Sequence, residues 1–308
     1  MPPLDVLVVG VGRWGERHLA TLKEMQDDEE IGKLYAFDID DSRKEAANHH
    51  GAIWSANIRR AGMAAIVSTN SASHFEVASN LIAEGIHVLI EKPMAENLAD
   101  ANALMNEAIA NEVVIETGLL LRHHPAIKRA RLLIAEGGIG QIERIHCSRH
   151  SSRNGSGNES IIDVLAIHYL DICCHLLHEA EPDQITADIE NHLTGTSCKI
   201  AMEFKPGIEA FCEVSWGAQE EIRHLEISGT EGYIEIDFSK HDSLIISDKE
   251  ISLSESTAPL KAELRNFLSQ ISSGRSQIPG IGRSALRSVS WKDRVLISNA
   301  DGAGMQEH

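Results

Sequence analysis

The chain has 308 residues, 43% of them hydrophobic and 24% charged, which is the length and composition of a globular protein of about two domains. Its 28 lysine and arginine residues are outnumbered by 46 aspartate and glutamate residues, and the formal charge of −18 repels a phosphate backbone, which excludes nucleic-acid binding as the main function. No apolar run approaches the roughly 20 residues that span a bilayer, residues 1–10 lack the pattern of a secretory signal, and five cysteines without a CxxC pair indicate reduced thiols in a cytoplasmic protein.

The first 120 residues alternate between short apolar segments and segments of helical character. The sequence predicts strands at 5–9, 33–38, 64–69, 87–91 and 113–118, and helices at 14–26, 41–50, 74–84 and 97–111. Strands that alternate with helices form βαβ units with a parallel sheet, and unbroken apolar strands fit a sheet covered on both faces. We therefore expect an α/β domain over residues 1–120.

After residue 120 the pattern changes. The sequence predicts helices at 125–136 and 161–178, strands at 184–192, 197–204, 208–216, 222–228, 232–238 and 243–247, and closing helices at 259–273 and 283–298. Consecutive strands joined by short turns predict an antiparallel sheet, so we expect an α+β domain with an open, mostly antiparallel sheet over residues 121–308. The serine- and glycine-rich segment 151–157 is either a lid over a substrate or a plain surface loop, and residues 300–308 are expected to be disordered.

Gly10, Gly12 and Gly15 match the pattern G-x-G-x-x-G between the first predicted strand and the first predicted helix. The first glycine permits a tight turn, the second lets a pyrophosphate approach the backbone, and the third allows close packing of helix on strand. The following helix N-terminus offers N–H groups and the positive end of a dipole to phosphates. The pattern predicts a dinucleotide site in a Rossmann domain, to which we assign Arg13 and Trp14 of the same turn; a glycine turn without a ligand is the alternative.

Asp38 stands at the end of the second predicted strand, at the usual distance from the glycine turn. A carboxylate at this point binds a ribose hydroxyl and repels a 2′-phosphate, which favours NAD over NADP. Arg13 and Arg43 leave NADP open, because either can pair with a 2′-phosphate. A helix N-cap is the alternative role for Asp38.

Glu91-Lys92-Pro93 directly follows a predicted strand within the run 64–108, and this run resembles the signature of the Gfo/Idh/MocA oxidoreductases. The resemblance continues through residues 118–142, 165–171, 227–237 and 259–268, so it covers nearly the whole chain. Within the family, RHHPAI and GTEGYIEI are most similar to nucleotide-sugar dehydrogenases, such as those that oxidise C3 of UDP-N-acetylglucosamine.

The resemblance implies a Rossmann domain followed by an α/β domain whose open sheet often forms the contact between subunits. It also implies hydride transfer between a nicotinamide and a sugar or polyol carbon, at a site between the domains. The expected partners are therefore NAD, a sugar or nucleotide-sugar substrate, and further copies of the chain in a homodimer or homotetramer.

Lys92 matches the family lysine that contacts the substrate hydroxyl and relays its proton. A cation at the carboxyl end of a strand, beside the cofactor, suits this task; a solvated surface lysine is the alternative. In the family, Pro93 often follows a cis peptide bond, and Glu91 is expected to position the loop or to contact the cofactor. Thr69, Asn70 and His74 fall where family members carry residues beside the nicotinamide ribose, although His74 also fits the start of a helix.

His168 matches the family histidine that acts as general base or lies beside the reacting hydroxyl, and an unperturbed imidazole pKa of about 6.5 suits this task. A core histidine is the alternative. Asp171 is expected on the same helix face, where it orients His168 or binds substrate. Many family members place an aspartate four residues before the histidine, where this chain has Val164. Asp163 comes five residues before His168, about 140° away on a regular helix, so only a bulge or a shifted helix start restores the pair.

Arg122 and His123 follow the last strand of the first predicted domain, in a loop that lines the substrate cleft in the family. Arg122 fits bidentate binding of a substrate carboxylate or phosphate, and a structural salt bridge is an equal alternative. His168, Asp171, His175 and His178 repeat at helical spacing, but over about 15 Å they cannot share one metal ion. Only a pair such as His168 with Asp171 remains a candidate, and since the family normally needs no metal we expect none.

These residues predict an NAD-dependent dehydrogenase that acts on a CH–OH group of a sugar or nucleotide sugar, with Lys92 and His168 handling the proton. Two alternatives stay open. One is a non-catalytic sensor that binds NAD(H), which the valine at position 164 motivates. The other is a reductase of a C=N or C=C bond on the same scaffold.

Overall fold

The computed structural model describes residues 3–55, 63–155, 160–190, 196–254, 257–274 and 281–304, without the side chains of 281–283 and 299–304. The chain divides into two compact units, Met1–Leu119 with Leu260–Val289 and Leu120–Pro259 with Ser290–His308. Residues 156 and 157 of the predicted lid or loop, and residues 305–308 of the predicted disordered tail, lie outside the described residues.

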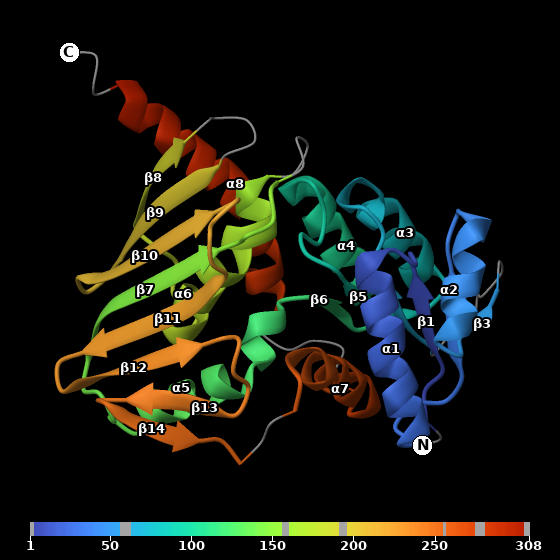
Figure 1. The fold of residues 1–308 in the computed structure, drawn as a ribbon. Coiled ribbons are helices and arrows are strands. Elements are labelled where there is room, and N and C mark those ends of the chain that lie inside the picture. Colours follow the sequence, from blue (N-terminus) through green and yellow to red (C-terminus); the bar gives the residue numbers. More distant parts are fainter. Residues whose placement is uncertain are drawn as a thin grey trace. The chain divides into compact units, whose positions relative to one another are not determined.

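In the described part of the first unit, six strands form a parallel sheet in the order β3-β2-β1-β4-β5-β6. Figure 1 labels β1, β3, β5 and β6 of this sheet. Their bounds are β1 Val6–Val9, β2 Leu34–Phe37, β3 Ile53–Trp54, β4 Ala64–Val67, β5 His87–Ile90 and β6 Ile115–Thr117. Along β1, Val6 and Val8 enter one core while Leu7 and Val9 enter the other. The sheet is therefore covered on both faces, which is why its strands are apolar throughout.

Helices supply the other half of each core. One core contains side chains of α1 (Arg13–Asp27), α2 (Lys44–His49) and α7 (Pro259–Ser272), and a short 3-10 helix, η1 (Asp41–Arg43), precedes α2. The other core contains side chains of α3 (Ser71–Ala83), α4 (Leu98–Ala110) and the start of α8 (Ile281–Gly304). The predicted elements of this region match these bounds closely, except that β3 is too short to give a sequence signal.

Residues 260–289 pack with the first unit, whereas the sequence places everything after residue 120 in the second domain. Leu264 and Phe267 of α7 are fully buried in the core on one face of the parallel sheet, and Val289 of α8 lies in the core on the other face. The rest of α8, with the buried Trp291, belongs to the core of the second unit. An amphipathic pattern identifies such helices, but it does not tell which sheet they cover.

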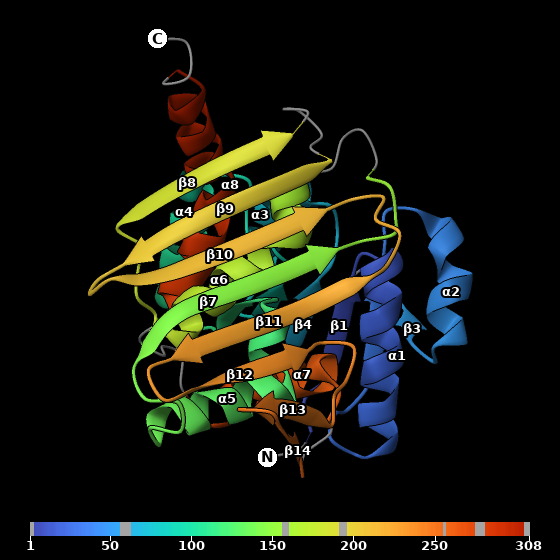
Figure 2. The ribbon, with the colours of Figure 1, turned by 60° about the vertical axis from the view of Figure 1, so that its left-hand side comes forward.

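The described strands of the second unit form an eight-stranded sheet in the order β14-β13-β12-β11-β7-β10-β9-β8 (Figure 2). Their bounds are β7 Ile142–His150, β8 Gln184–Glu190, β9 Ser197–Phe204, β10 Ile208–Ser215, β11 Ile222–Gly229, β12 Gly232–Asp237, β13 Ser243–Ile246 and β14 Lys249–Ser252. Neighbours are antiparallel except β7 and β10, which run parallel. The open, mostly antiparallel sheet is confirmed.

Strand β7 lies in the middle of this sheet, yet the sequence analysis does not predict it. Ile145 and Cys147 are fully buried, whereas the alternate residues His146 and Ser148 are only half-buried. The alternation of a half-buried strand is thus present, but the charged residues around it weaken the apolar signal. The short, polar β14 is missed for the same reason.

Helical segments cover one face of this sheet (Figure 2): η2 (Leu120–His123), α5 (Pro125–Ala135), a π-helix η3 (Ile162–Ala166) and α6 (Ile167–Leu176). The five cysteines are buried and form no disulfide. Residues 300–304 continue α8 instead of beginning a disordered tail; glycines at 302 and 304 lower helix propensity but do not end this helix. Among the described residues, no helix is long and apolar enough to cross a membrane.

The assignment of α7 to the first unit makes a stability prediction. Phe267→Ala removes a fully buried ring from the core beside β1, and we expect the free energy of unfolding to fall by about 3–5 kcal/mol. Ser269→Ala, an exposed position on the same helix, is the control and should change it by less than about 0.5 kcal/mol. Urea unfolding measures both, and equal stability of the two variants would show that α7 does not belong to this core.

Candidate functional site

The glycine turn after β1 has the backbone geometry that a dinucleotide requires. Gly10 has φ +92°, and a Cβ there would lie 2.8 Å from the backbone of Ser68. A Cβ on Gly15 would lie 1.9 Å from the carbonyl oxygen of Gly10, so only glycine lets α1 start this close to β1. Gly12 has no neighbour within 4 Å of its Cβ position and gives the N-terminus of α1 no side-chain cap. The turn therefore leaves open space in front of the helix N–H groups, where a pyrophosphate fits.

Asp38 lies directly after β2 and faces this turn. Its Oδ2 accepts a hydrogen bond from the N–H of Val11 at 2.7 Å, and its Oδ1 accepts one from the N–H of Asp40 at 2.9 Å. The N-cap of the following helical turn is Asp40, whose side chain accepts from the N–H of Ser42, so the alternative role for Asp38 is already filled by its neighbour. Nε of Arg43 lies 3.8 Å from Oδ2 of Asp40 in an exposed ion pair. The carboxylate beside the glycine turn fits NAD, as predicted.

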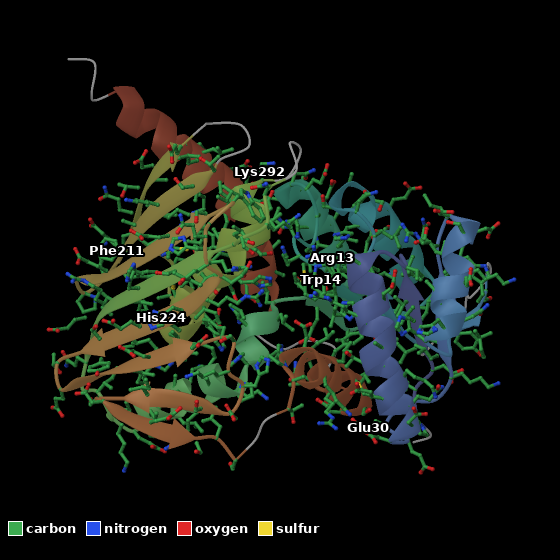
Figure 3. All side chains as sticks on the ribbon, viewed as in Figure 1. Arg13, Trp14, Glu30, Phe211, His224 and Lys292 are labelled. Carbon is green, nitrogen blue, oxygen red and sulfur yellow. The ribbon has the colours of Figure 1, made fainter. Side chains whose placement is uncertain are left out.

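Arg13 and Trp14 begin helix α1 (Figure 3). Arg13 is exposed, and Trp14 is half-buried with the guanidinium carbon of Arg17 4.8 Å from its ring centre. The structure thus brings both residues to the first turn of α1, next to the open space at Gly12.

The loops after β4 and β5 are joined by a buried histidine. The Lys92–Pro93 peptide bond is cis, as the resemblance implies. His74, in the first turn of α3, is 1% exposed, and its ring nitrogens lie 2.8 Å from the carbonyl oxygen of Pro93 and 3.1 Å from that of Thr69. This burial favours a role in holding the two loops over the predicted direct contact with a cofactor. Asn70, at the N-cap of α3, is exposed.

Glu91 is tied to helix α1 by a contact that the sequence analysis misses. Its Oε1 accepts a hydrogen bond from Nε2 of His18 at 2.8 Å, and the His18 side chain is fully buried. His18 lies one turn after Gly15 on the face of α1 that packs against the sheet. Lys92, the next residue after Glu91, is half-buried in the loop that follows β5. The strand order places β4 between β1 and β5, so the glycine turn, the Thr69 loop and the Lys92 loop follow neighbouring parallel strands.

In the second unit, a π-helix lies just before His168, where the sequence analysis requires a bulge. Residues Ile162–Ala166 form this π-helix, and α6 continues directly from Ile167. Because a π-helix closes hydrogen bonds between residues five apart, it brings positions i and i+5 closer together than a regular helix does, and Asp163 and His168 have that spacing. Asp163 also pairs with Lys292 of α8, whose Nζ lies 3.7 Å from its Oδ2. His168 is half-buried.

Arg122 and Asp171 bond to each other. The guanidinium donates two hydrogen bonds of 2.6 Å to the Asp171 carboxylate and two further bonds of 2.9 and 3.0 Å to Glu179. Burial disfavours the charge of Arg122, but the two carboxylates outweigh it and raise its pKa. This arrangement favours the structural salt bridge over substrate binding for Arg122.

His123 and His175 lie near this ion-pair network. Burial, with the charges of Lys128 and Arg122, lowers the pKa of His123 to about 4, so its imidazole is neutral. Nδ1 of His175 lies 2.8 Å from Oε1 of Glu179, and its Nε2 lies 3.2 Å from Nη1 of Arg131. Helix α6 ends at Leu176, so the helical spacing considered for a metal site stops before residue 178. Among the described residues, no group of three or more His, Cys, Asp or Glu side chains is arranged to hold a metal ion.

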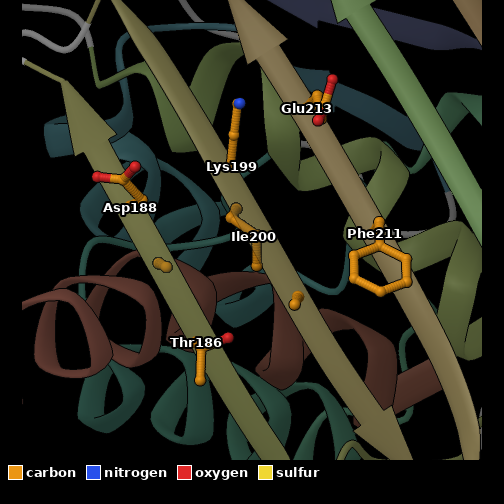
Figure 4. Close-up of a pocket in the computed structure, with 8 residues that line it drawn as sticks. Thr186, Asp188, Lys199, Ile200, Phe211 and Glu213 are labelled. Atoms are coloured by element: carbon orange, nitrogen blue, oxygen red, sulfur yellow. The ribbon is translucent and has the colours of Figure 1, made fainter. Parts of the chain in front are cut away.

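A shallow hollow of about 330 Å³ lies on the sheet of the second unit, across β8, β9 and β10 (Figure 4). Lys199 stands in register between Asp188 and Glu213 of the neighbouring strands. The hollow is lined by Thr186, Ala187, Asp188, Lys199, Ile200, Ala201, Phe211 and Glu213, none of which is a predicted site residue.

Comparison with known proteins gives a consistent result for both units. Residues 4–119 match the model of an oxidoreductase family with an NAD-binding Rossmann fold, and residues 127–235 match the model of the GFO/IDH/MocA C-terminal domain. A UDP-N-acetylglucosamine 3-dehydrogenase of Acidithiobacillus ferrooxidans is 28% identical over 248 residues, which are 75% of this chain and 77% of that protein. A myo-inositol 2-dehydrogenase of Thermotoga maritima is 23% identical over 96% of this chain and 99% of its own.

Solved structures share the fold. That of the Acidithiobacillus ferrooxidans enzyme has a TM-score of 0.83 at 23% identity and covers 97% of this chain and 99% of its own. A levoglucosan dehydrogenase in complex with NADH has a TM-score of 0.84 at 17% identity, with 97% of both chains covered. Together with the glycine turn, Asp38 and the cis Lys92–Pro93 bond, these matches show that the chain belongs to the Gfo/Idh/MocA family of NAD-binding oxidoreductases.

Proposed function

We propose that the chain is an NAD-dependent dehydrogenase that transfers hydride between a hydroxyl-bearing carbon of a sugar or nucleotide sugar and nicotinamide. The observation that carries the proposal is the position of Lys92: its loop follows β5, and the open glycine turn follows β1, at the same edge of one parallel sheet. In parallel α/β sheets, ligands bind outside this edge. The similarity to a UDP-N-acetylglucosamine 3-dehydrogenase supports a nucleotide sugar as substrate.

The residues of the first unit bind the cofactor and stabilise charge. The N–H groups at the start of α1 bind the pyrophosphate in the space left at Gly12, and Asp38 accepts a hydrogen bond from a ribose hydroxyl. When bound, NAD supplies the acceptor of the hydride. The Lys92 ammonium donates a hydrogen bond to the substrate oxygen and stabilises the negative charge that develops on it as the proton leaves. Thr69 and Asn70 line the cofactor side of the same edge, beside the loop that His74 holds.

His168 acts as the general base of the proposed reaction. An imidazole nitrogen accepts the hydroxyl proton, and the carboxylate of Asp163, on the same helix face through the π-helix, orients the ring and stabilises its charged form. π-bulges are frequent at functional sites. This register supports catalysis in spite of Val164, and therefore disfavours a purely cofactor-sensing role. His123, neutral and half-buried, fits a hydrogen-bonding contact to the substrate, whereas Arg122 and Asp171 support the loop that carries it.

We further propose that the chain assembles as a homodimer or homotetramer through the face of the eight-stranded sheet opposite α5 and α6. Phe211 and His224 project from this sheet (Figure 3). Both are half-buried, and the ring of Phe211 stacks with the guanidinium of Arg144 at 5.7 Å. Light scattering of the purified chain reports the mass of the assembly.

A panel assay tests the proposed reaction. The purified chain is given NAD or NADP with UDP-N-acetylglucosamine, other nucleotide sugars, free sugars and inositols, and nicotinamide absorbance is followed. Reduction of NAD with one class is expected and identifies it. If no substrate of the panel reduces NAD, although titration in the same cuvette shows that NAD binds, the result would favour the sensor or the C=N/C=C reductase instead.

Lys92→Ala should lower turnover of the identified substrate by about 10²–10⁴-fold with NAD affinity retained, because the lysine acts on the substrate oxygen. Lys33→Ala, an exposed lysine that precedes β2 at the opposite edge of the sheet, is the matched control and should keep full turnover. Steady-state kinetics with a fluorescence titration of NADH measures both quantities. Unchanged turnover in Lys92→Ala would remove the lysine from the reaction.

His168→Asn should lower kcat by about 10²–10⁴-fold at neutral pH, and Asp163→Asn should lower it in the same direction, because both act on one proton. His178→Asn, an exposed histidine of the same unit, is the control and should keep full turnover. Kinetics at several pH values should show that the rise of kcat with pH in the wild type disappears in the His168 variant. A His168→Asn variant with the wild-type pH profile would rule out the histidine as base.

A further inference from the structure

Helix α7 brings a buried glutamate to the parallel sheet. Glu263 is 1% exposed, and none of the described residues forms a hydrogen bond with its Oε1. Its neighbours Leu264 and Phe267 are fully buried in the core that α1 and β1 also enter. An ionised carboxylate in such a place loses its hydration without a compensating donor, which is costly.

Two further buried carboxylates lie near Glu263. Glu116 of β6 stands in register beside Leu89 of β5, and it accepts hydrogen bonds from Asn266 (3.0 Å) and Gln270 of α7. Glu91, two residues beyond Leu89, accepts from His18 at 2.8 Å. Glu116 and Glu91 therefore accept hydrogen bonds from neutral or imidazole donors, whereas Oε1 of Glu263 has no donor among the described residues. Burial, together with the charges of Glu91 and Glu116, raises the pKa of Glu263 well above its ordinary value.

Two other charged residues of α7 form ion pairs with the chain after α1. Lys261 pairs with Asp28 at 2.8 Å, and Arg265 forms two hydrogen bonds, of 2.6 and 2.7 Å, with Glu30; both partners follow α1 at its C-terminal end. The charges that act on Glu263 are those of Glu91, in the loop after β5, and Glu116, on β6. A buried carboxyl group beside two other carboxylates keeps its proton more readily than it ionises.

We propose that Glu263 is a positioning residue that stays protonated: as a neutral acid it leaves Glu91 ionised and bonded to His18, and so fixes the loop of Lys92 and Pro93 against helix α1. The effect on catalysis rests on the proposed function of Lys92, but the protonation of Glu263 and its effect on cofactor binding do not. Glu263 thus supports the nucleotide-binding unit from a segment that lies more than 140 residues after Gly118 in the chain.

The protonation is tested by thermal unfolding of the full-length chain between about pH 5 and pH 9. Because the folded-state pKa of Glu263 is raised, its stabilising effect is complete below the ordinary glutamate pKa and is lost as the pH rises towards the folded-state value. Glu263→Gln carries no titratable proton. Its Tm relative to wild type should therefore increase with pH, by at least about 3 °C over the range.

Glu76→Gln, an exposed acid on α3, is the matched control, and its Tm difference from wild type should stay constant. A difference for Glu263→Gln that also stays constant would show that Glu263 titrates normally, and it would overturn the proposal. The unfolding experiment needs no substrate, so its result stays valid even if no sugar of the panel is oxidised.

The positioning role is tested by fluorescence titration with NADH, which likewise needs no substrate. Glu263→Ala should weaken NADH binding about tenfold, because a displaced loop no longer meets the cofactor, and the neutral isostere Glu263→Gln should restore affinity to within about twofold of wild type. Equal losses in the two variants, or no loss in either, would overturn the positioning role. If Glu263→Ala does not fold, the affinity of Glu263→Gln and the unfolding series decide the question alone.

Discussion

The close approach of helix α1 to strand β1 is the constraint on which the first unit depends. A Cβ on Gly15 would lie 1.9 Å from the carbonyl oxygen of Gly10, so the helix starts directly over the end of the strand only because both residues are glycines. The same approach leaves Gly12 facing open space and directs the N-terminus of α1 towards it. One turn later it brings His18 within 2.8 Å of Glu91, the residue before Lys92. A single backbone contact therefore relates the phosphate-binding turn to the loop that carries the proposed catalytic lysine.

Networks of buried ionisable side chains form in both units. In the first unit, Glu91 and Glu116 accept hydrogen bonds from donors on α1 and α7, and we propose that Glu263 keeps a proton. In the second unit, Arg122 binds Asp171 and Glu179, which fixes the start of the unit to α6 and the residues after it. Removing one partner of such a pair leaves an uncompensated charge in a dry core, which is far more costly than the pair is stabilising. These networks therefore fix geometry around the site more than they add stability.

Much of the fold follows from local sequence pattern, and the failures have physical causes. Apolar strands such as 64–67 and the glycine turn at 10–15 carry strong local signals, so the parallel sheet and the cofactor site are predictable. Strand β7 is missed because polar and charged residues alternate with its buried ones, and α7 is assigned to the second domain because an amphipathic pattern does not tell which sheet a helix covers. The π-helix is anticipated only as a possible bulge, since no residue of 162–166 signals it by type. His18, Lys292 and Glu263 are missed because their roles depend on contacts between distant segments.

Deuterium transfer is the decisive test of the proposed passage of hydride from a sugar carbon to the cofactor bound at the glycine turn. Once the panel identifies a substrate, that substrate is prepared with deuterium on the oxidised carbon and incubated with NAD, and the NADH formed is isolated and analysed by mass spectrometry. We expect NADH that carries the deuterium, and none formed by Lys92→Ala on the same timescale. NADH without deuterium, or label released to water, would contradict direct hydride transfer and the mechanism built on it.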